Sequence, residues 1–128
     1  AKGYPIKFLV NAPFSTLRRF YSKSKIFWHA AGFEIDDRRQ PHQVEHFGIT
    51  PVEAMAAGCV PVVMDKGGLK EIVRRGVGER WITIKDLKTK TKKIIKNEKL
   101  YDQYQQASLA RAKQFSKNKF FLQLQKLL

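Results

Sequence analysis

The chain has 128 residues, enough for one compact domain and too few for two. Hydrophobic residues make up 43%, and 25 Lys/Arg against 11 Asp/Glu give a formal charge of +14. Residues 85–128 hold 12 basic and 3 acidic side chains, so most of the positive excess lies in the C-terminal third. Such a charge favours anionic partners, namely nucleic acid, phosphorylated ligands or an acidic membrane surface. A solvated, lysine-rich helix face is the simpler alternative.

The single cysteine, Cys59, excludes an intrachain disulfide and suits a reducing compartment. Its place between Gly58 and a valine-rich stretch favours a small buried side chain over a nucleophile. No apolar run approaches the ~18 residues of a membrane-spanning helix, and the N-terminus has no apolar signal-peptide core. We therefore expect a cytoplasmic chain, with peripheral association at an anionic membrane as an open possibility.

The first 44 residues predict two strands, a helix and a long loop. Apolar runs at 6–10 and 26–30 predict the strands. Between them a helix capped by Ser15 is expected through about Ser22, with an inward face at i, i+3 and i+4 that consists of Leu17, Phe20 and Tyr21. Residues 31–44 show no period and predict a surface loop. A loop of that length is often functional, although an insertion without chemistry is equally open.

A clear helix start follows the loop. Thr50 at the N-cap, Pro51 at the first helical position and Glu53 at the third predict a capping box. Gly58 is expected to end this helix.

The remaining chain predicts two more strands and a helical C-terminal third. Val60–Met64 predicts a strand, 66–68 a turn, 69–75 a short helix with Ile72 and Val73 inward, and 81–84 a fourth strand. From about Asp86 the period is helical to the end, with a break near Ser116. The alternation of strands and helices predicts an α/β fold, a doubly wound parallel sheet.

The order of elements makes the stretch from Glu45 to Glu53 a candidate ligand-binding site. Ligands of such sheets bind at the carboxyl ends of the strands, and this stretch follows a strand and opens a helix. The orphan N–H groups of a helix start attract phosphate, and Gly48 lets a ligand approach the backbone. Glu45 can meet a sugar hydroxyl or a developing positive charge, and Glu53 the vicinal hydroxyls of a ribose. The simpler readings stay open: Glu53 is explained by the capping box, and Glu45 by solvent.

The same stretch resembles a known family. Glu45-His46-Phe47-Gly48, followed by Glu53-Ala54-Met55-Ala56-Ala57-Gly58, is similar to the Glu-x7-Glu motif of the retaining glycosyltransferases of family four, which are group 1 glycosyl transferases of GT-B fold. Val60-Pro61-Val62-Val63 follows as in that family, and 67–73 is similar to its Gly-Gly-x-x-Glu-Ile-Val. Upstream 17–27 and downstream 112–120 also resemble it, so the likeness covers nearly the whole chain in order.

The resemblance implies a function and site residues. The family has two Rossmann-like domains, with helices on both faces of each sheet, and the C-terminal one holds most of a nucleoside diphosphate sugar. Glu45 would be the catalytic residue at the transferred hexose, such as mannose or glucose. His46, Phe47, Gly48, Ile49 and Thr50 would face the donor, with backbone groups at the sugar and diphosphate, and Glu53 would hold the ribose. No cofactor and no metal are implied. His46 replaces the commoner glycine, as in some mannosyltransferases that act on lipid-linked glycans.

The chain also departs from the family. The two strands that carry the diphosphate-gripping Arg and Lys have no counterpart in residues 1–25, and the acceptor-binding N-terminal domain has none either. Residues 1–128 are therefore expected to be a single, truncated C-terminal nucleotide-sugar-binding domain that is inactive alone and acts with the missing domain on a glycan or lipid-linked acceptor. The alternative is a non-catalytic α/β module that binds a phosphate ligand or nucleic acid. The chain has no recognised nucleic-acid reader motif, so no specific nucleic acid is expected.

Overall fold

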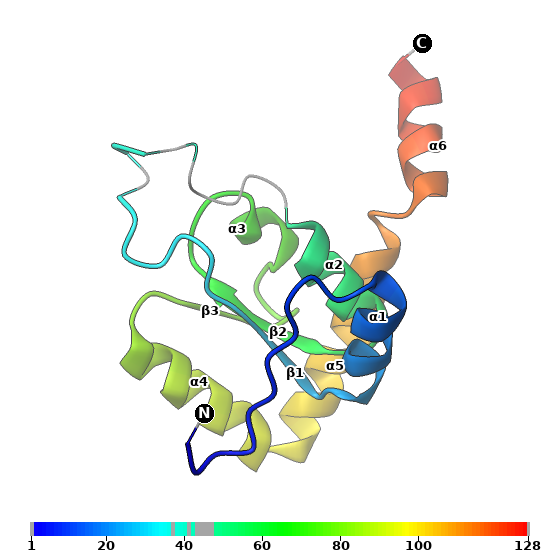
Figure 1. Cartoon of the computed structure of the whole chain (residues 1–128). Helices are drawn as coiled ribbons and strands as arrows, with labels where there is room; N and C mark the ends of the chain where they lie inside the picture. Colours follow the sequence, from blue (N-terminus) through cyan, green and yellow to red (C-terminus); the bar gives the residue numbers. More distant parts are fainter. Residues whose placement is uncertain (1, 37, 41, 43–47, 128) are drawn as a thin grey trace.

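The structure of the chain is a computed structural model that describes residues 2–36, 38–40, 42 and 48–127. Its described part is an α/β unit built on one parallel sheet (Figure 1). The elements in chain order are α1 (Phe14–Lys23), β1 (Ile26–His29), α2 (Ile49–Ala56), β2 (Val60–Met64), α3 (Leu69–Ile72), β3 (Glu79–Trp81), α4 (Ile84–Lys96), α5 (Glu98–Lys113) and α6 (Lys117–Leu127).

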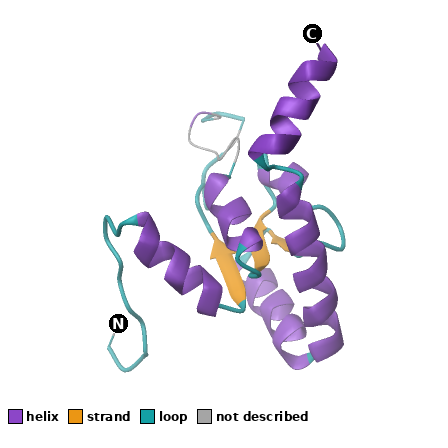
Figure 2. Cartoon of the chain, turned by 90° about the vertical axis from the view of Figure 1, so that its right-hand side faces the viewer, coloured by secondary structure: helices purple, strands orange, loops and turns teal. Residues whose placement is uncertain are grey.

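The sheet has the strand order β1-β2-β3, and both pairings are parallel. Ile26 lies opposite Val60, and Val62 lies opposite Glu79. Helices flank the sheet, with α1 and α5 on opposite sides of it (Figure 2). The predicted fold class, an α/β parallel sheet with helices on both faces, is confirmed. The prediction follows from the apolar run Val60–Met64, all of whose residues are buried, because a central parallel strand is covered on both faces.

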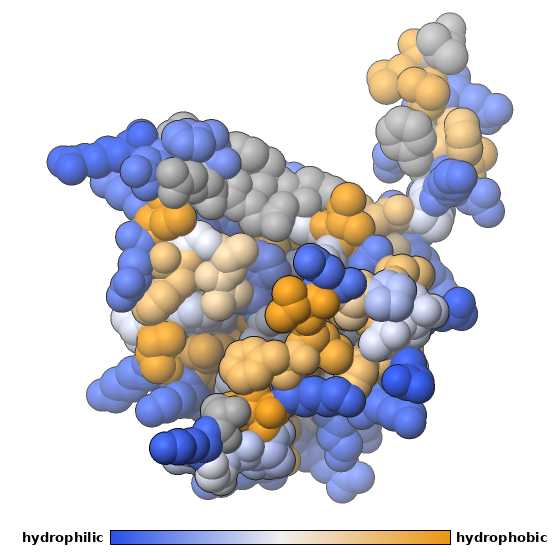
Figure 3. All heavy atoms as spheres, in the orientation of Figure 1, coloured by the Kyte–Doolittle hydropathy of each residue, from blue (hydrophilic) through white to orange (hydrophobic). Residues whose placement is uncertain are grey.

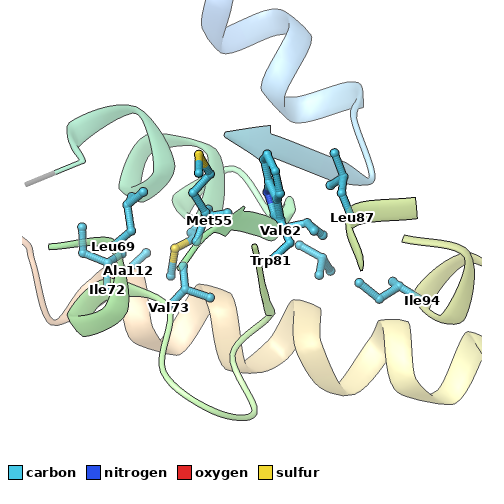
Figure 4. Packing of buried hydrophobic residues seen from close by; sticks show 12 residues of the cluster. Met55, Val62, Leu69, Ile72, Val73, Trp81, Leu87, Ile94 and Ala112 are labelled. Carbon is cyan, nitrogen blue, oxygen red and sulfur yellow. The ribbon is translucent and has the colours of Figure 1, made fainter. Parts of the chain in front are cut away.

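The core lies where β2, β3, α2 and α3 meet α4 and α5. Figure 4 shows Trp81 at its centre, between Met55 of α2 and Leu87 of α4. Ile72 and Val73 are also buried, so the inward positions predicted for 69–75 are confirmed. Ile94 of α4 is buried beside them, whereas Ile95 is 68% exposed. Cys59 is buried too, and its thiol donates to the carbonyl of Tyr21 at 3.1 Å. Burial raises the pKa of that thiol, which agrees with a structural role.

The strand predicted at 6–10 is wrong. These residues form no strand, and Ile6, Phe8 and Val10 are 54%, 77% and 81% exposed. The segment crosses the face seen in Figure 3, where it contributes an apolar area in the middle. A strand needs a neighbour for its backbone groups, and the amide of Ile6 bonds only locally, to the carbonyl of Tyr4. Residues 6–10 therefore have the apolar character of a strand but lack the backbone pairing that a strand requires.

Several predicted boundaries also move. The first helix begins at Phe14 with Pro13 as N-cap, so Ser15 does not cap it, although Leu17, Phe20 and Tyr21 do form its half-buried face. The helix predicted at 69–75 ends at Ile72. The strand predicted at 81–84 spans Glu79–Trp81 instead, because Thr83 caps α4 by accepting from the amide of Asp86 at 3.1 Å.

The last helix projects from the body. The break predicted near Ser116 is confirmed, since α5 ends at Lys113 and α6 begins at Lys117. In Figures 1 and 2, α6 extends away from the sheet. Its apolar residues Phe121, Leu122 and Leu127 are 54%, 53% and 83% exposed, so α6 adds nothing to the core around Trp81.

Candidate functional site

The candidate site lies at the carboxyl edge of the sheet, around the start of α2. Glu45, His46 and Phe47, which the sequence assigns to the sugar and the diphosphate, lie outside the described residues. Gly48, Ile49, Thr50 and Glu53 are described, and all four lie on the first turns of α2. The site is therefore built here from α2 and the segments that contact it.

The capping box predicted at Thr50 and Glu53 is wrong. The helix begins at Ile49 with Gly48 as N-cap, and no side chain caps it. Pro51 becomes the third helical residue, where it still displaces no hydrogen bond, since the first four N–H groups of a helix have no partner inside it. The amides of Ile49 and Thr50 find no acceptor among the described residues. As far as the described residues go, these two N–H donors lie at the positive end of the helix dipole without an acceptor, an arrangement that suits an anion.

Gly48 is buried, and space explains why it is glycine. A Cβ there would lie 2.8 Å from Cγ of Pro51 and 3.1 Å from Cδ2 of Leu69, the first residue of α3. Because Leu69 follows β2, this contact brings the starts of α2 and α3 together at the carboxyl edge. The sequence predicted a glycine that admits a ligand to the backbone, and the structure adds that Gly48 lets two helix starts pack closely.

The far end of α2 is fixed by Gly58. The amide of Gly58 donates to the carbonyl of Met55, and the amide of Cys59 donates to that of Ala54, both at 3.0 Å. With φ of +92° at Gly58 this is a Schellman motif, so the predicted helix end is confirmed. The motif sets the direction in which α2 returns to β2, and with it the position of the helix start.

Glu53 lies in a groove between α2 and the end of α5. A cavity of about 510 Å³ is lined on the α2 side by Ile49, Val52, Glu53 and Ala56, and on the other side by Leu109, Ala112, Lys113, Phe115 and Ser116. Ile49 and Glu53 are thus brought together on one face of α2. Burial first, and then the negative charge of Glu53, raise the pKa of Tyr21 on α1, so this carboxylate lies within electrostatic reach of that phenol. Thr50 is exposed.

The loop after β1 is anchored to the same edge by Lys66 and Phe33. The Lys66 ammonium donates to the carbonyl of Gly32 at 3.3 Å and to that of Ile35. Phe33 packs on Trp81 with ring centroids 5.5 Å apart. The predicted surface loop is confirmed for the described part of 31–44, which holds no strand and no α-helix, but it is tied to the core. These contacts set the base from which the loop runs towards Glu45.

We expect Lys66→Met to loosen this loop. The change removes a charged donor from two carbonyls while keeping much of the aliphatic chain, at a cost of about 1–1.5 kcal/mol. Hydrogen exchange at the amides of residues 31–36 should accelerate, because local openings of low free energy govern exchange. Lys70→Met is the matched control, since Lys70 is exposed on α3. Equal exchange in both variants would show that Lys66 does not hold the loop.

The sequence missed the side of the groove that faces α2. The other side comes from the end of α5 and the turn after it, more than fifty positions away, and no local pattern links these residues to Glu53: Leu109, Ala112, Lys113 and Phe115. Lys66 was also missed, because a lysine after a strand gives no sign that its ammonium binds loop carbonyls.

Two further observations concern metal ions and membrane spans. Within the described ranges no group of three or more His, Cys, Asp or Glu side chains could hold a metal ion. The expectation that no metal or cofactor takes part stays a prediction. No helix of the described chain is long and apolar enough to cross a bilayer.

Comparison with known proteins decides the family. The model of the family "Glycosyl transferases group 1" matches residues 5–111. The chain belongs to the group 1 glycosyl transferases. The match includes β1 to β3, α2 and nearly all of α5. The α2 side of the groove and Leu109 lie inside it, and the other four lining residues, 112, 113, 115 and 116, lie beyond it. The resemblance seen in the Glu45–Glu53 stretch is thereby confirmed at the level of the family.

Two relatives from this comparison are similar to part of this group 1 glycosyl transferase chain. Both are described as "GDP-Man:Man(3)GlcNAc(2)-PP-Dol alpha-1,2-mannosyltransferase", one from Xenopus laevis and one from Xenopus tropicalis. Each is 37% identical over 68 residues, which is 53% of this chain and 12% of the relative. The chain thus spans a small part of the length of the relatives that it matches.

Proposed function

We propose that this chain is the nucleotide-sugar-binding part of a retaining hexosyltransferase that transfers mannose or glucose from a nucleoside diphosphate sugar to a glycan or lipid-linked acceptor. One observation carries the proposal: the groove beside α2 holds the carboxylate of Glu53 next to a helix start whose first two amides have no acceptor among the described residues. Family membership and the donor in the name of the two relatives, GDP-Man, support it. The acceptor is proposed from the same relatives, whose name contains a PP-Dol-linked glycan.

The proposed roles follow from the chemistry of each group. The amides of Ile49 and Thr50 and the dipole of α2 hold the negative diphosphate. Gly48 has no side chain to keep the donor from the backbone. Glu53 accepts hydrogen bonds from the ribose hydroxyls, and Glu45 stabilises positive charge that develops on the transferred sugar. No metal is needed, so the rate of transfer should be unchanged by a chelator.

Donor binding by a longer protein that contains this chain tests the proposal. A thermal-shift panel of UDP-, GDP- and ADP-sugars should identify one donor that raises the melting temperature, because a ligand of the native state stabilises it. Glu53→Ala should weaken that donor by about 10–100-fold, the effect of losing hydrogen bonds to a charged acceptor. Glu45→Gln should lower the rate of transfer with a smaller effect on donor affinity.

Glu98→Gln is the control, since Glu98 is an exposed carboxylate at the start of α5, outside the groove. If transfer and donor affinity in the Glu45 and Glu53 variants match the control, the assignment of both carboxylates is wrong. The 128-residue chain alone is expected to show no transfer, and robust turnover by it would contradict the need for a separate acceptor-binding part.

A further inference from the structure

A second cavity lies on the outer side of β3, away from the groove at α2. It measures about 460 Å³ and is enclosed by the loop after α3, by β3, and by residues of α4 and α5. None of the donor-site residues on α2 lines it. It is polar and basic, with two carboxylates and five cationic side chains in its lining, which are those of Arg74, Arg75, Arg80, Lys90 and Lys93.

Both carboxylates of this pocket already have cationic partners. Oε1 of Glu79 accepts from the hydroxyl of Tyr104 at 2.8 Å and from the ammonium of Lys93 at 3.0 Å, and the Glu79 side chain is only 14% exposed. Asp65 pairs with Arg80 at 3.4 Å. Burial, and then the hydrogen bond to Glu79, raise the pKa of Tyr104 to about 12, so its hydroxyl stays a donor at neutral pH. These pairs neutralise two of the five cations.

A surplus of positive charge remains on Arg74 and Arg75, because Asp86 pairs with Lys90. Lys90 donates to the carbonyl of Arg80 and to the carboxylate of Asp86, the latter at 3.2 Å. Arg74 and Arg75 are exposed and contact no carboxylate in the described part of the chain. Arg74 also lies near Arg111, whose pKa is lowered by burial first and then by the positive charge of Arg74.

We propose that this pocket binds a phosphate group, held by the guanidinium groups of Arg74 and Arg75. Guanidinium groups present paired N–H donors that match two phosphate oxygens, and an anion relieves the repulsion between neighbouring cations. The cavity is far larger than a bare phosphate, so it has room for a ligand that carries further atoms. Its phosphate comes either from a free phosphorylated compound or from the headgroup of an anionic lipid.

A matched pair of double variants tests the site in the 128-residue chain. Calorimetric titration with inorganic phosphate and pyrophosphate at constant ionic strength should detect binding, and Arg74→Gln with Arg75→Gln should weaken it by about tenfold or more. Lys88→Gln with Lys92→Gln removes the same charge from exposed positions on α4 outside the lining, and should leave the affinity unchanged. Both double variants should keep the melting temperature, because all four side chains are exposed.

A vesicle arm distinguishes the two sources of phosphate. Flotation compares phosphatidylcholine vesicles containing phosphatidic acid with phosphatidylserine vesicles of equal surface charge. If the chain prefers phosphatidic acid and the arginine variant loses this preference, the phosphate is that of a lipid headgroup. If the chain binds phosphate or pyrophosphate without this preference, the ligand is a free compound. If both double variants lose the same affinity, net charge alone explains the binding and the proposal is overturned. The absence of binding in both the titration and the flotation would also overturn it.

Discussion

Replacing Trp81 by alanine is expected to remove about 3–5 kcal/mol from the free energy of unfolding, the usual cost of deleting a fully buried aromatic side chain. Trp81 is 0% exposed, ends β3 and packs on Phe33 and the core of Figure 4. The total free energy of unfolding of a native protein is about 5–15 kcal/mol, so this substitution removes a large part of the stability of the domain. Chemical denaturation followed by circular dichroism measures the change. Ile82→Ala, next in the chain and 68% exposed, should cost little.

A second substitution keeps this expectation testable if the alanine variant fails to fold. Nε1 of Trp81 is buried and finds no acceptor among the described residues. Trp81→Phe removes that unsatisfied donor, a gain of about 1–3 kcal/mol that offsets much of the cavity left by the smaller ring. We therefore expect Trp81→Phe to fold with a stability near that of the original chain. A loss as large as that of the alanine variant would show that the indole N–H has a partner.

Replacing Gly78 by alanine should destabilise the domain by about 3 kcal/mol, at the upper end of the cost of overpacking. A Cβ at Gly78 would lie 2.3 Å from the carbonyl oxygen of Pro61 and 2.7 Å from its Cγ. The nearest atom belongs to the backbone of β2 and cannot rotate away. The added carbon therefore pushes β3 from β2 where their pairing begins, beside Glu79.

Gly76, in the same loop, gives the matched control because it is glycine for a different reason. Its φ is +86° and nothing lies within 4 Å of an added Cβ, so Gly76→Ala costs about 1–2 kcal/mol of backbone strain. Asparagine tolerates this backbone conformation, so the Asn variant should be more stable than the Ala variant at position 76. At position 78 the larger Asn side chain should make the Asn variant less stable than the Ala variant, because the added volume causes the clash. Unfolding free energies of the four variants measure the order, and the same order at both positions would contradict the steric argument.

The amino-acid sequence by itself determined the fold class, the family and the central elements. Val60–Met64 reads as a buried strand because a run of five apolar residues after Gly58 is too short for a buried helix and suits a strand covered on both faces. Gly58 marked the end of α2 because a Schellman turn needs positive φ. The Glu45–Glu53 stretch pointed to the group 1 glycosyl transferases, and the family match agrees. These features are local, or fixed in spacing, and can be read without coordinates.

Tertiary structure decided what depends on neighbours distant in the chain. The apolar residues at 6–10 form no strand, because no neighbouring strand in the described part of the chain pairs with their backbone groups. Thr50 suits an N-cap by residue type, yet α2 starts at Ile49, where the packing of Gly48 on Leu69 fixes the turn. The groove at Glu53, the Lys66 anchor and the basic pocket beside β3 join residues more than fifteen positions apart, which only a folded chain brings together. Local sequence therefore determines which helices and strands form, whereas long-range packing determines where they end and which residues come together in the groove and the basic pocket.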